Sequence, residues 1–198
     1  MKKLLFASAV LMSLFSSAPS YAFESTDLNW FAGLGYEFGG QRYSGGTYVG
    51  SGISENAYAN EGWRVMFGAS VPNNAAKTFE TQFSLGYKFG GPNGERSGII
   101  WNTLPVEVVE YYRQGHWRTG LGLVYHVDTH VDFQSVNQPT ESFRVNNGLG
   151  YVASMVYTPV AHNYAMELRY TYLKQAFADS PDDKLKASVF GAFLHYRF

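Results

Sequence analysis

Apolar and polar residues alternate along most of this chain with a period of two. The clearest example is Thr78–Phe89, whose odd-numbered positions are aromatic or aliphatic apart from Thr81. Its even-numbered positions are polar, charged or glycine. Successive side chains of a β-strand point to opposite faces, so this pattern predicts a strand with one apolar face and one polar face.

Segments of this kind recur along the chain, each about 10–14 residues long, which is the length that a tilted strand needs to cross a bilayer. The eight segments are Leu28–Phe38, Glu61–Val71, Thr78–Phe89, Ile99–Tyr112, Trp117–Val127, Gly148–Thr158, Asn163–Lys174 and Leu185–Phe198. The fourth is the least regular, because Pro105 removes a backbone donor and Asn102 falls among the apolar positions. We expect no helix after residue 22.

The connections between these segments alternate in length. Short connections lie near residues 72–77, 113–116 and 159–162, and longer ones span 39–60, 90–97, 128–147 and 175–184. Short turns on the side of both chain ends, with long loops opposite, are typical of outer-membrane barrels, whose short turns face the periplasm. A secreted β-sandwich has no reason to sort its loops in this way. The sequence therefore predicts an all-β fold, an eight-stranded antiparallel up-and-down transmembrane β-barrel.

The amino-terminal segment indicates export. Lys2 and Lys3 precede an apolar core at Leu4–Phe15, and small residues lead to a cleavage site after Ala22. We interpret residues 1–22 as a secretory signal peptide and residues 23–198 as one outer-membrane β-barrel domain. The chain has no cysteine, which excludes a lipoprotein anchor and a disulfide scaffold. Its formal net charge of −1 argues against nucleic acid as a partner.

The polar faces of the segments carry charges of both signs. Eight strands enclose an interior that side chains can fill, so an open pore is not expected. Acidic and basic groups in such an interior should pair, because an unpaired buried charge is costly. The alternative is a proton or ion path. The predicted interior charges are Glu37, Arg64, Glu80, Lys88, Glu107, Arg118, Glu167, Arg169 and Arg197.

A period-two run of histidine and aspartate follows the fifth segment. If the strand continues, His126, Asp128, His130 and Asp132 all point to one side. Imidazole and carboxylate groups suit Zn²⁺, Ni²⁺ or Cu²⁺, which makes these residues candidate metal ligands. The alternative is a solvated polar rim, and we expect no metal or other cofactor.

A lipid A hydrolase is the enzymatic alternative. Deacylases of the PagL type carry histidine and serine two residues apart on one lipid-facing strand. The matching spacing here is His126-Val127-Asp128, so aspartate occupies the nucleophile position, and the alternation turns His126 inward. Ser135 and Ser142 follow with Glu141, but nothing in the sequence holds them against a histidine. We therefore predict no catalytic residues.

The chain resembles the small outer-membrane barrels of the OmpA transmembrane-domain, OmpX and Ail kind. The resemblance depends on the leader, the alternating segments and the terminal HYRF at His195–Phe198. It implies an outer-membrane protein folded by the barrel-assembly machinery and surrounded by membrane lipid and lipopolysaccharide. It also implies a role in envelope structure or adhesion, with loops 39–60 and 128–147 as the candidate contact surface. A narrow channel is the remaining alternative.

Overall fold

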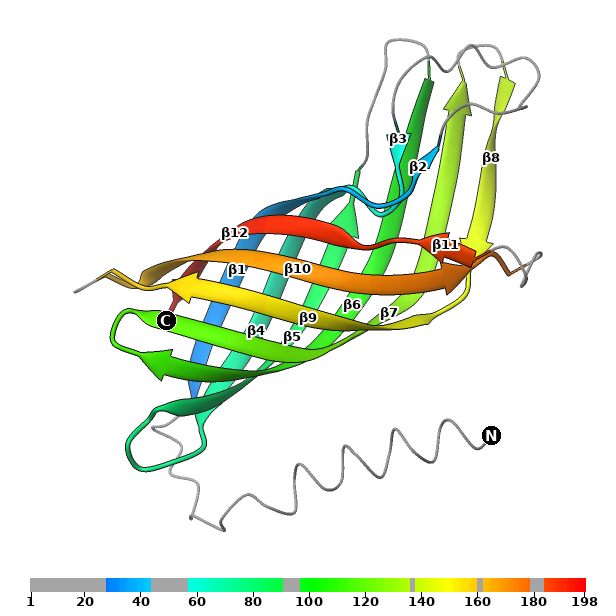
Figure 1. The fold of residues 1–198 in the computed structure, drawn as a ribbon. Coiled ribbons are helices and arrows are strands. Elements are labelled where there is room, and N and C mark those ends of the chain that lie inside the picture. Colours follow the sequence, from blue (N-terminus) through cyan, green and yellow to red (C-terminus); the bar gives the residue numbers. More distant parts are fainter. Residues whose placement is uncertain (1–27, 44–56, 91–96, 136–137, 160–161, 179–183) are drawn as a thin grey trace, which may run out of the picture.

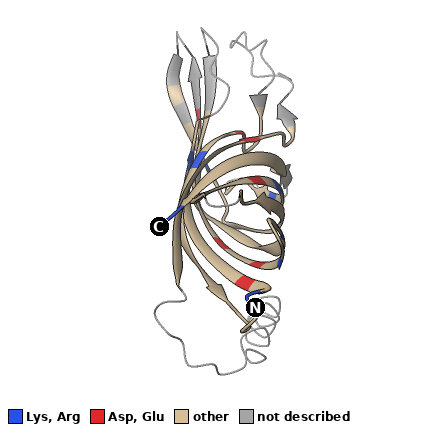
Figure 2. Ribbon diagram, turned by 90° about the vertical axis from the view of Figure 1, so that its left-hand side faces the viewer, with Lys and Arg blue, Asp and Glu red and all other residues tan. Residues whose placement is uncertain are grey.

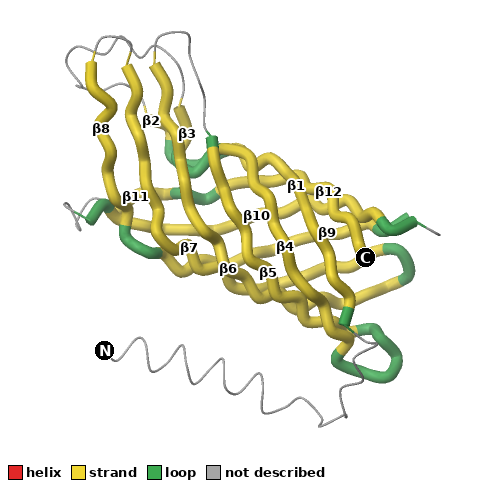
Figure 3. Tube along the Cα trace, turned by 180° about the vertical axis from the view of Figure 1, so that it is seen from behind, coloured by secondary structure: helices red, strands yellow, loops and turns green. Residues whose placement is uncertain are grey.

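The fold consists of β-strands and their connections (Figures 1 and 3). The computed structural model describes residues 28–43, 57–90, 97–135, 138–159, 162–178 and 184–198. The predicted signal peptide, residues 1–22, lies outside the described residues. Within them, no helix is long and apolar enough to cross a membrane.

Eight long strands close into a barrel. They are β1 (Asn29–Phe38), β4 (Gly62–Pro72), β5 (Phe79–Phe89), β6 (Ser97–Gln114), β7 (Trp117–Ser135), β9 (Gly148–Tyr157), β10 (Tyr164–Ala176) and β12 (Val189–Arg197). Each pairs antiparallel with the next, and β1 pairs with β12, for example Leu34 with Leu194. The predicted fold class, an all-β eight-stranded antiparallel barrel, is confirmed.

The wall of this barrel is apolar outside and polar inside. On β5 the odd-numbered side chains are exposed, except the intermediate Thr81, and the even-numbered ones are buried. Leu85 keeps 57% of its surface exposed, while Lys88 keeps none. This is the reverse of a soluble protein, in which the apolar face of a sheet is the buried one. The outer face therefore requires an apolar surrounding.

Aromatic residues concentrate at both ends of the outer wall. At one end, Trp63 pairs in register with Phe89, and at the other the Trp117 and Tyr157 rings lie 4.8 Å apart. Tyrosine and tryptophan favour the interface between hydrocarbon and water. Asn102, which fell among apolar positions in the sequence, lies at the first of these ends and accepts a hydrogen bond of 3.2 Å from the Tyr87 hydroxyl.

Three strands extend beyond the barrel at one end, as Figure 1 shows. They are Ser97–Asn102 of β6, Thr129–Ser135 of β7, and β8 (Gln138–Val145), which pairs with β7. We call this sheet the arm, its end of the barrel the arm end, and the opposite end the turn end. The loop predicted over 128–147 is therefore wrong, because most of it is the β7–β8 hairpin.

Shorter elements cover the arm end. A two-stranded ladder joins β2 (Arg42–Tyr43) to β3 (Ala57–Tyr58), and β11 (Lys184–Lys186) pairs with the end of β10. Hydrogen bonds connect these pieces, including Gln41 N–H to the Lys186 carbonyl at 2.8 Å. A buried apolar cluster at the base of the arm closes the mouth. It combines three arm residues with two from or next to the shorter elements: Trp101, Val131, Val145, Ala59 and Leu185.

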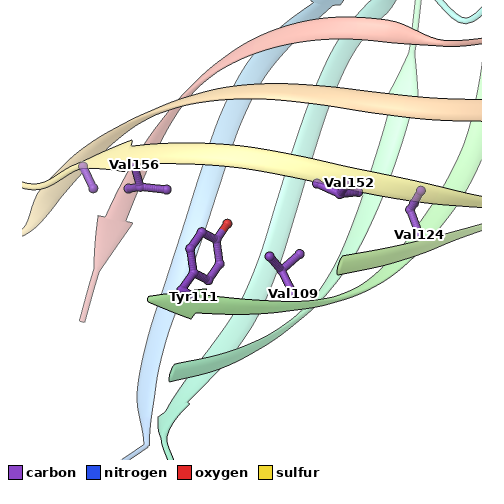
Figure 4. Close-up of a cluster of buried hydrophobic side chains, with 6 residues drawn as sticks. Val109, Tyr111, Val124, Val152 and Val156 are labelled. Atoms are coloured by element: carbon purple, nitrogen blue, oxygen red, sulfur yellow. The ribbon is translucent and has the colours of Figure 1, made fainter. Parts of the chain in front are cut away.

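The interior is partly apolar. A second cluster lines the wall formed by β6, β7, β9 and β10 and includes Val109, Tyr111, Val124, Val152 and Val156 (Figure 4). Gly120 makes room for the Tyr111 ring, because a Cβ atom at Gly120 would lie 2.6 Å from Tyr111 Cε1. Tyrosine and valine thus occupy space that a pore would leave open.

Candidate functional site

A network of buried ion pairs occupies the interior toward the arm end. Lys88 Nζ lies 2.6 Å from Glu37 Oε2 and also donates to the Asn60 carbonyl oxygen. Arg64 Nη1 lies 2.8 Å from Glu107 Oε1 and 3.6 Å from Glu37 Oε1. β1, β4, β5 and β6 each contribute one of these charged side chains, so the network ties separate strands together across the lumen.

The network continues on β10 and β12. Arg169 Nη1 lies 2.8 Å from Glu107 Oε2, and Arg169 Nη2 lies 2.9 Å from Glu167 Oε1. The second Glu167 oxygen lies 2.6 Å from His195 Nε2. The Arg169 guanidinium also lies 5.0 Å from the centre of the Phe193 ring. Each charge therefore has a partner of opposite sign or an aromatic face in contact.

Charge balance explains how this group tolerates burial. Three carboxylates, Glu37, Glu107 and Glu167, face three strong cations, Arg64, Lys88 and Arg169. Removing charges from water costs several kcal/mol for each ion, on the order of what close pairing and hydrogen bonding return. The balanced group therefore fills the lumen without a net buried charge.

A second charged group lies at the turn end. The Glu80 carboxylate accepts hydrogen bonds from three arginines. The donors are Arg118 Nη1, Arg113 Nη2 at 2.8 Å and Arg197 Nη2 at 3.4 Å. Tyr111 connects the two groups. Its ring lies 5.0 Å from the Arg118 guanidinium, and its hydroxyl donates to Glu167 Oε1 at 3.3 Å.

The structure places every predicted interior charge in one of these two groups. Figure 2 shows both acidic and basic positions on the strands of the barrel. Sequence reasoning omitted His195, Tyr111 and Arg113 from the network. The period-two signal was present for all of them, since His195 shares its face with Arg197, and Tyr111 and Arg113 share theirs with Glu107.

The four candidate metal ligands do not share a face. The prediction that all four point to one side of a continuing strand is therefore wrong. Asp128 has a φ of 51° and adds one extra residue to β7 opposite Thr103, which makes a β-bulge. The bulge reverses the alternation. His126 is buried inside the barrel, whereas Asp128, His130 and Asp132 lie on the outer side of the strand. Among the residues that the structure describes, no group of three potential ligands is placed to hold a metal ion.

The polar groups around this bulge make hydrogen bonds to other protein groups. His130 Nδ1 lies 3.2 Å from the Asp128 carbonyl oxygen, and the Ser142 hydroxyl donates to Asp132 Oδ1 at 2.6 Å. His126 has no serine as a hydrogen-bond partner among the described side chains, and its Nδ1 atom is unpartnered. The described residues therefore do not assemble the histidine–serine arrangement of a deacylase.

The arm has two sheet edges. On the β6 side, pairing with β5 ends at Thr103, and the Trp101 N–H bonds to the Gly90 carbonyl at 2.9 Å. On the β8 side, Val145 bridges to Phe177 at the base. Beyond these contacts, 97–100 of β6 and 138–143 of β8 have β7 as their only strand partner among the described residues.

Comparison with known proteins supports the fold. No protein-family model and no curated protein matches the chain. Neisserial surface protein A (NspA) is similar at a TM-score of 0.50 and 12% identity, covering 87% of this chain and 97% of that one. Ail, the attachment invasion locus protein of Yersinia pestis, gives 0.48 and 14%, covering 86% and 97%. The similarity to NspA and the closed eight-stranded barrel confirm the resemblance to small eight-stranded barrels for the fold.

Proposed function

We propose that this chain is a non-enzymatic outer-membrane protein whose closed barrel anchors a surface-exposed arm, and that the arm makes the functional contact. The observation that carries this proposal is the continuation of β6 and β7 beyond the barrel to form a sheet whose two outer strands pair only with β7 over 97–100 and 138–143 among the described residues. Unpaired backbone N–H and C=O groups on such edges pair readily with an extended segment of another protein.

The outer-membrane location is supported by the apolar outer wall and its aromatic ends. A closed barrel leaves no strand edge in the hydrocarbon, because each strand of the wall pairs with a neighbour on both sides. Leu121 keeps 72% of its surface exposed at mid-wall, and hydrocarbon tails would cover it. In this proposal residues 1–22 direct export, lipid and lipopolysaccharide surround the wall, and the arm end faces the exterior.

A non-enzymatic role is supported by the contents of the barrel. The interior charges pair with one another, and His126 is enclosed on the side away from lipid. A deacylase acting on lipid A would need its histidine and nucleophile on the lipid face. Mass spectrometry of lipid A from cells with and without the gene should show the same acyl chains. A change in the acyl profile that depends on the gene would support the hydrolase instead.

The arm can be shortened without disturbing its base. Val131 and Phe143 are register partners, so residues 132–142 can be replaced by an Asn-Gly turn. The buried cluster at the base of the arm keeps Val131 and Val145. As a matched control, residues 136 and 137 are replaced by the same Asn-Gly pair between the register partners Ser135 and Gln138, which leaves the arm at full length.

Cells that display each variant are compared for adhesion to cultured cells and to immobilised matrix proteins. We expect the control to adhere as the original chain does and the shortened variant to lose adhesion. Surface levels and barrel folding of both variants are measured in parallel. Full adhesion by the shortened variant, at equal surface level, would contradict a functional arm.

A further inference from the structure

Three arginine side chains converge on one carboxylate at the turn end. Glu80 receives Arg118 from β7, Arg113 from the end of β6, and Arg197 from the end of β12. β6 and β7 are neighbours, with Arg113 and Arg118 as register partners, whereas β12 belongs to another part of the wall, between β10 and β1. Among the described residues, Glu80 is the only carboxylate within salt-bridge distance of any of the three arginines.

This group carries an excess positive charge. Three guanidinium groups and one carboxylate leave two unbalanced charges, in contrast to the balanced group toward the arm end. Glu110 does not supply the missing charge, because it is exposed on the outer face and accepts a hydrogen bond of 2.6 Å from the Thr81 hydroxyl. Buried charge without a counter-charge is unfavourable, so the group has a strong electrostatic preference for an anion.

The three arginines lie at different depths. The Arg118 and Glu80 side chains are each 4% exposed, whereas Arg197 is 21% and Arg113 is 35% exposed. The group therefore has a fixed floor and an outer part that solvent reaches. Arg118 Nε is buried and has no hydrogen-bond partner. Arg113 and Arg197 each donate one hydrogen bond to Glu80. Since a guanidinium has five N–H groups, both arginines keep further donors for an incoming group.

We propose that this cluster, Arg113, Arg118 and Arg197 over Glu80, is a binding site for a phosphate group. Guanidinium donors match the oxygen spacing of phosphate and bind it in pairs. The excess charge of the cluster complements a phosphate dianion, and a phosphodiester would neutralise part of it. Two sources share this chemistry, a lipid headgroup in the leaflet at the turn end and a soluble phosphate compound. The site is independent of any contact made by the arm.

The test uses the full mature chain, refolded in a detergent without phosphorus at low ionic strength. Calorimetric titration with inorganic phosphate is expected to show one saturable site. The variant Arg113→Gln/Arg197→Gln removes the outer donors and leaves Arg118 on Glu80. Because each charge-assisted hydrogen bond contributes appreciably, the variant should bind roughly tenfold more weakly or worse. The matched control is Arg144→Gln, on the exposed arm, which should bind phosphate as the original chain does.

A second measurement distinguishes the two sources. The chain is placed in vesicles of phosphatidylglycerol, released, and weighed by native mass spectrometry for retained lipid. Lipid retention that the double variant loses, without binding of inorganic phosphate, identifies a headgroup site; phosphate binding without lipid retention identifies a soluble ligand. If the original chain binds neither, or if the double variant binds both as tightly as the original chain, the phosphate site is wrong.

Discussion

Arg169 donates from a single nitrogen, Nη1, to both carboxylate oxygens of Glu107, at 3.0 and 2.8 Å. Arg169 belongs to β10 and Glu107 to β6, so this pair spans the lumen between strands that are not neighbours in the wall. The same arginine also holds Glu167. Arg169 is therefore the residue on which the balance of the interior group depends most.

Replacing Arg169 with methionine should destabilise the barrel strongly. The change leaves Glu107 and Glu167 buried with too few cations, which costs about 3–5 kcal/mol. Unfolding in urea, followed by tryptophan fluorescence in lipid vesicles, measures the loss. Arg144→Met is the control, because the Arg144 side chain is 68% exposed on the arm and should change stability little. Equal stability of R169M and R144M would contradict a structural role for the network.

A charge on the outer wall should oppose membrane insertion. Leu85→Lys places an ammonium group against hydrocarbon near mid-wall, at a cost of about 2–4 kcal/mol. The cost is read from the folded fraction in vesicles across a urea series. Thr140→Lys, on the arm, should insert as the original chain does, and Gln82→Lys, facing the interior, should be milder than Leu85→Lys. If the Gln82 change is the more damaging, the two faces of β5 have been exchanged.

The filled interior should carry no steady current. Paired charges, the Tyr111 ring and the buried cluster at the base of the arm obstruct the lumen along its length. We expect planar bilayers that contain the purified chain to show baseline conductance, whereas an open porin measured in the same bilayers conducts. Ohmic current that scales with the amount of folded chain would instead support the narrow channel.

Enlarging Gly120 should strain the interior. A side chain there meets the Tyr111 ring, with Cβ 2.6 Å from Cε1, so Gly120→Val forces the ring to move at a cost of about 1–3 kcal/mol. Ala153→Val is the control, because Ala153 is the register partner of neighbouring Leu121 and faces outward. Denaturation in vesicles should show a lower free energy of unfolding for Gly120→Val than for Ala153→Val. Equal stability of the two variants would contradict a tight contact between Gly120 and the Tyr111 ring.

Zinc should not bind saturably to His126, Asp128, His130 and Asp132. The bulge at Asp128 places His126 inside and His130 outside, so the two imidazoles cannot bind one ion. Calorimetric titration of the refolded chain with Zn²⁺ is expected to give only heats of dilution, the same for the original chain and for His130→Ala. A one-to-one isotherm that His130→Ala abolishes would restore the metal site.

The sequence predicted the barrel because period-two alternation is a local property, readable strand by strand. It also indicated which charges face inward. It could not show that Glu107 meets Arg64 and Arg169, because β4, β6 and β10 are not adjacent, and their relative heights depend on the stagger around the whole barrel. The arm was missed for a different reason. Its polar residues resembled a loop, and aspartate at a positive φ gives no clear signal in sequence.

The continuity of β6 and β7 from wall to arm has a mechanical consequence. A partner pulling on the arm would load the β6–β7 ladder lengthwise, so that many hydrogen bonds resist together instead of opening one after another. The Asp128 bulge lies where this load enters the barrel, and the apolar cluster around Trp101 packs close beneath it. Tension applied at the tip of the arm would thus pass directly into the barrel wall, because β6 and β7 continue from one into the other without a break.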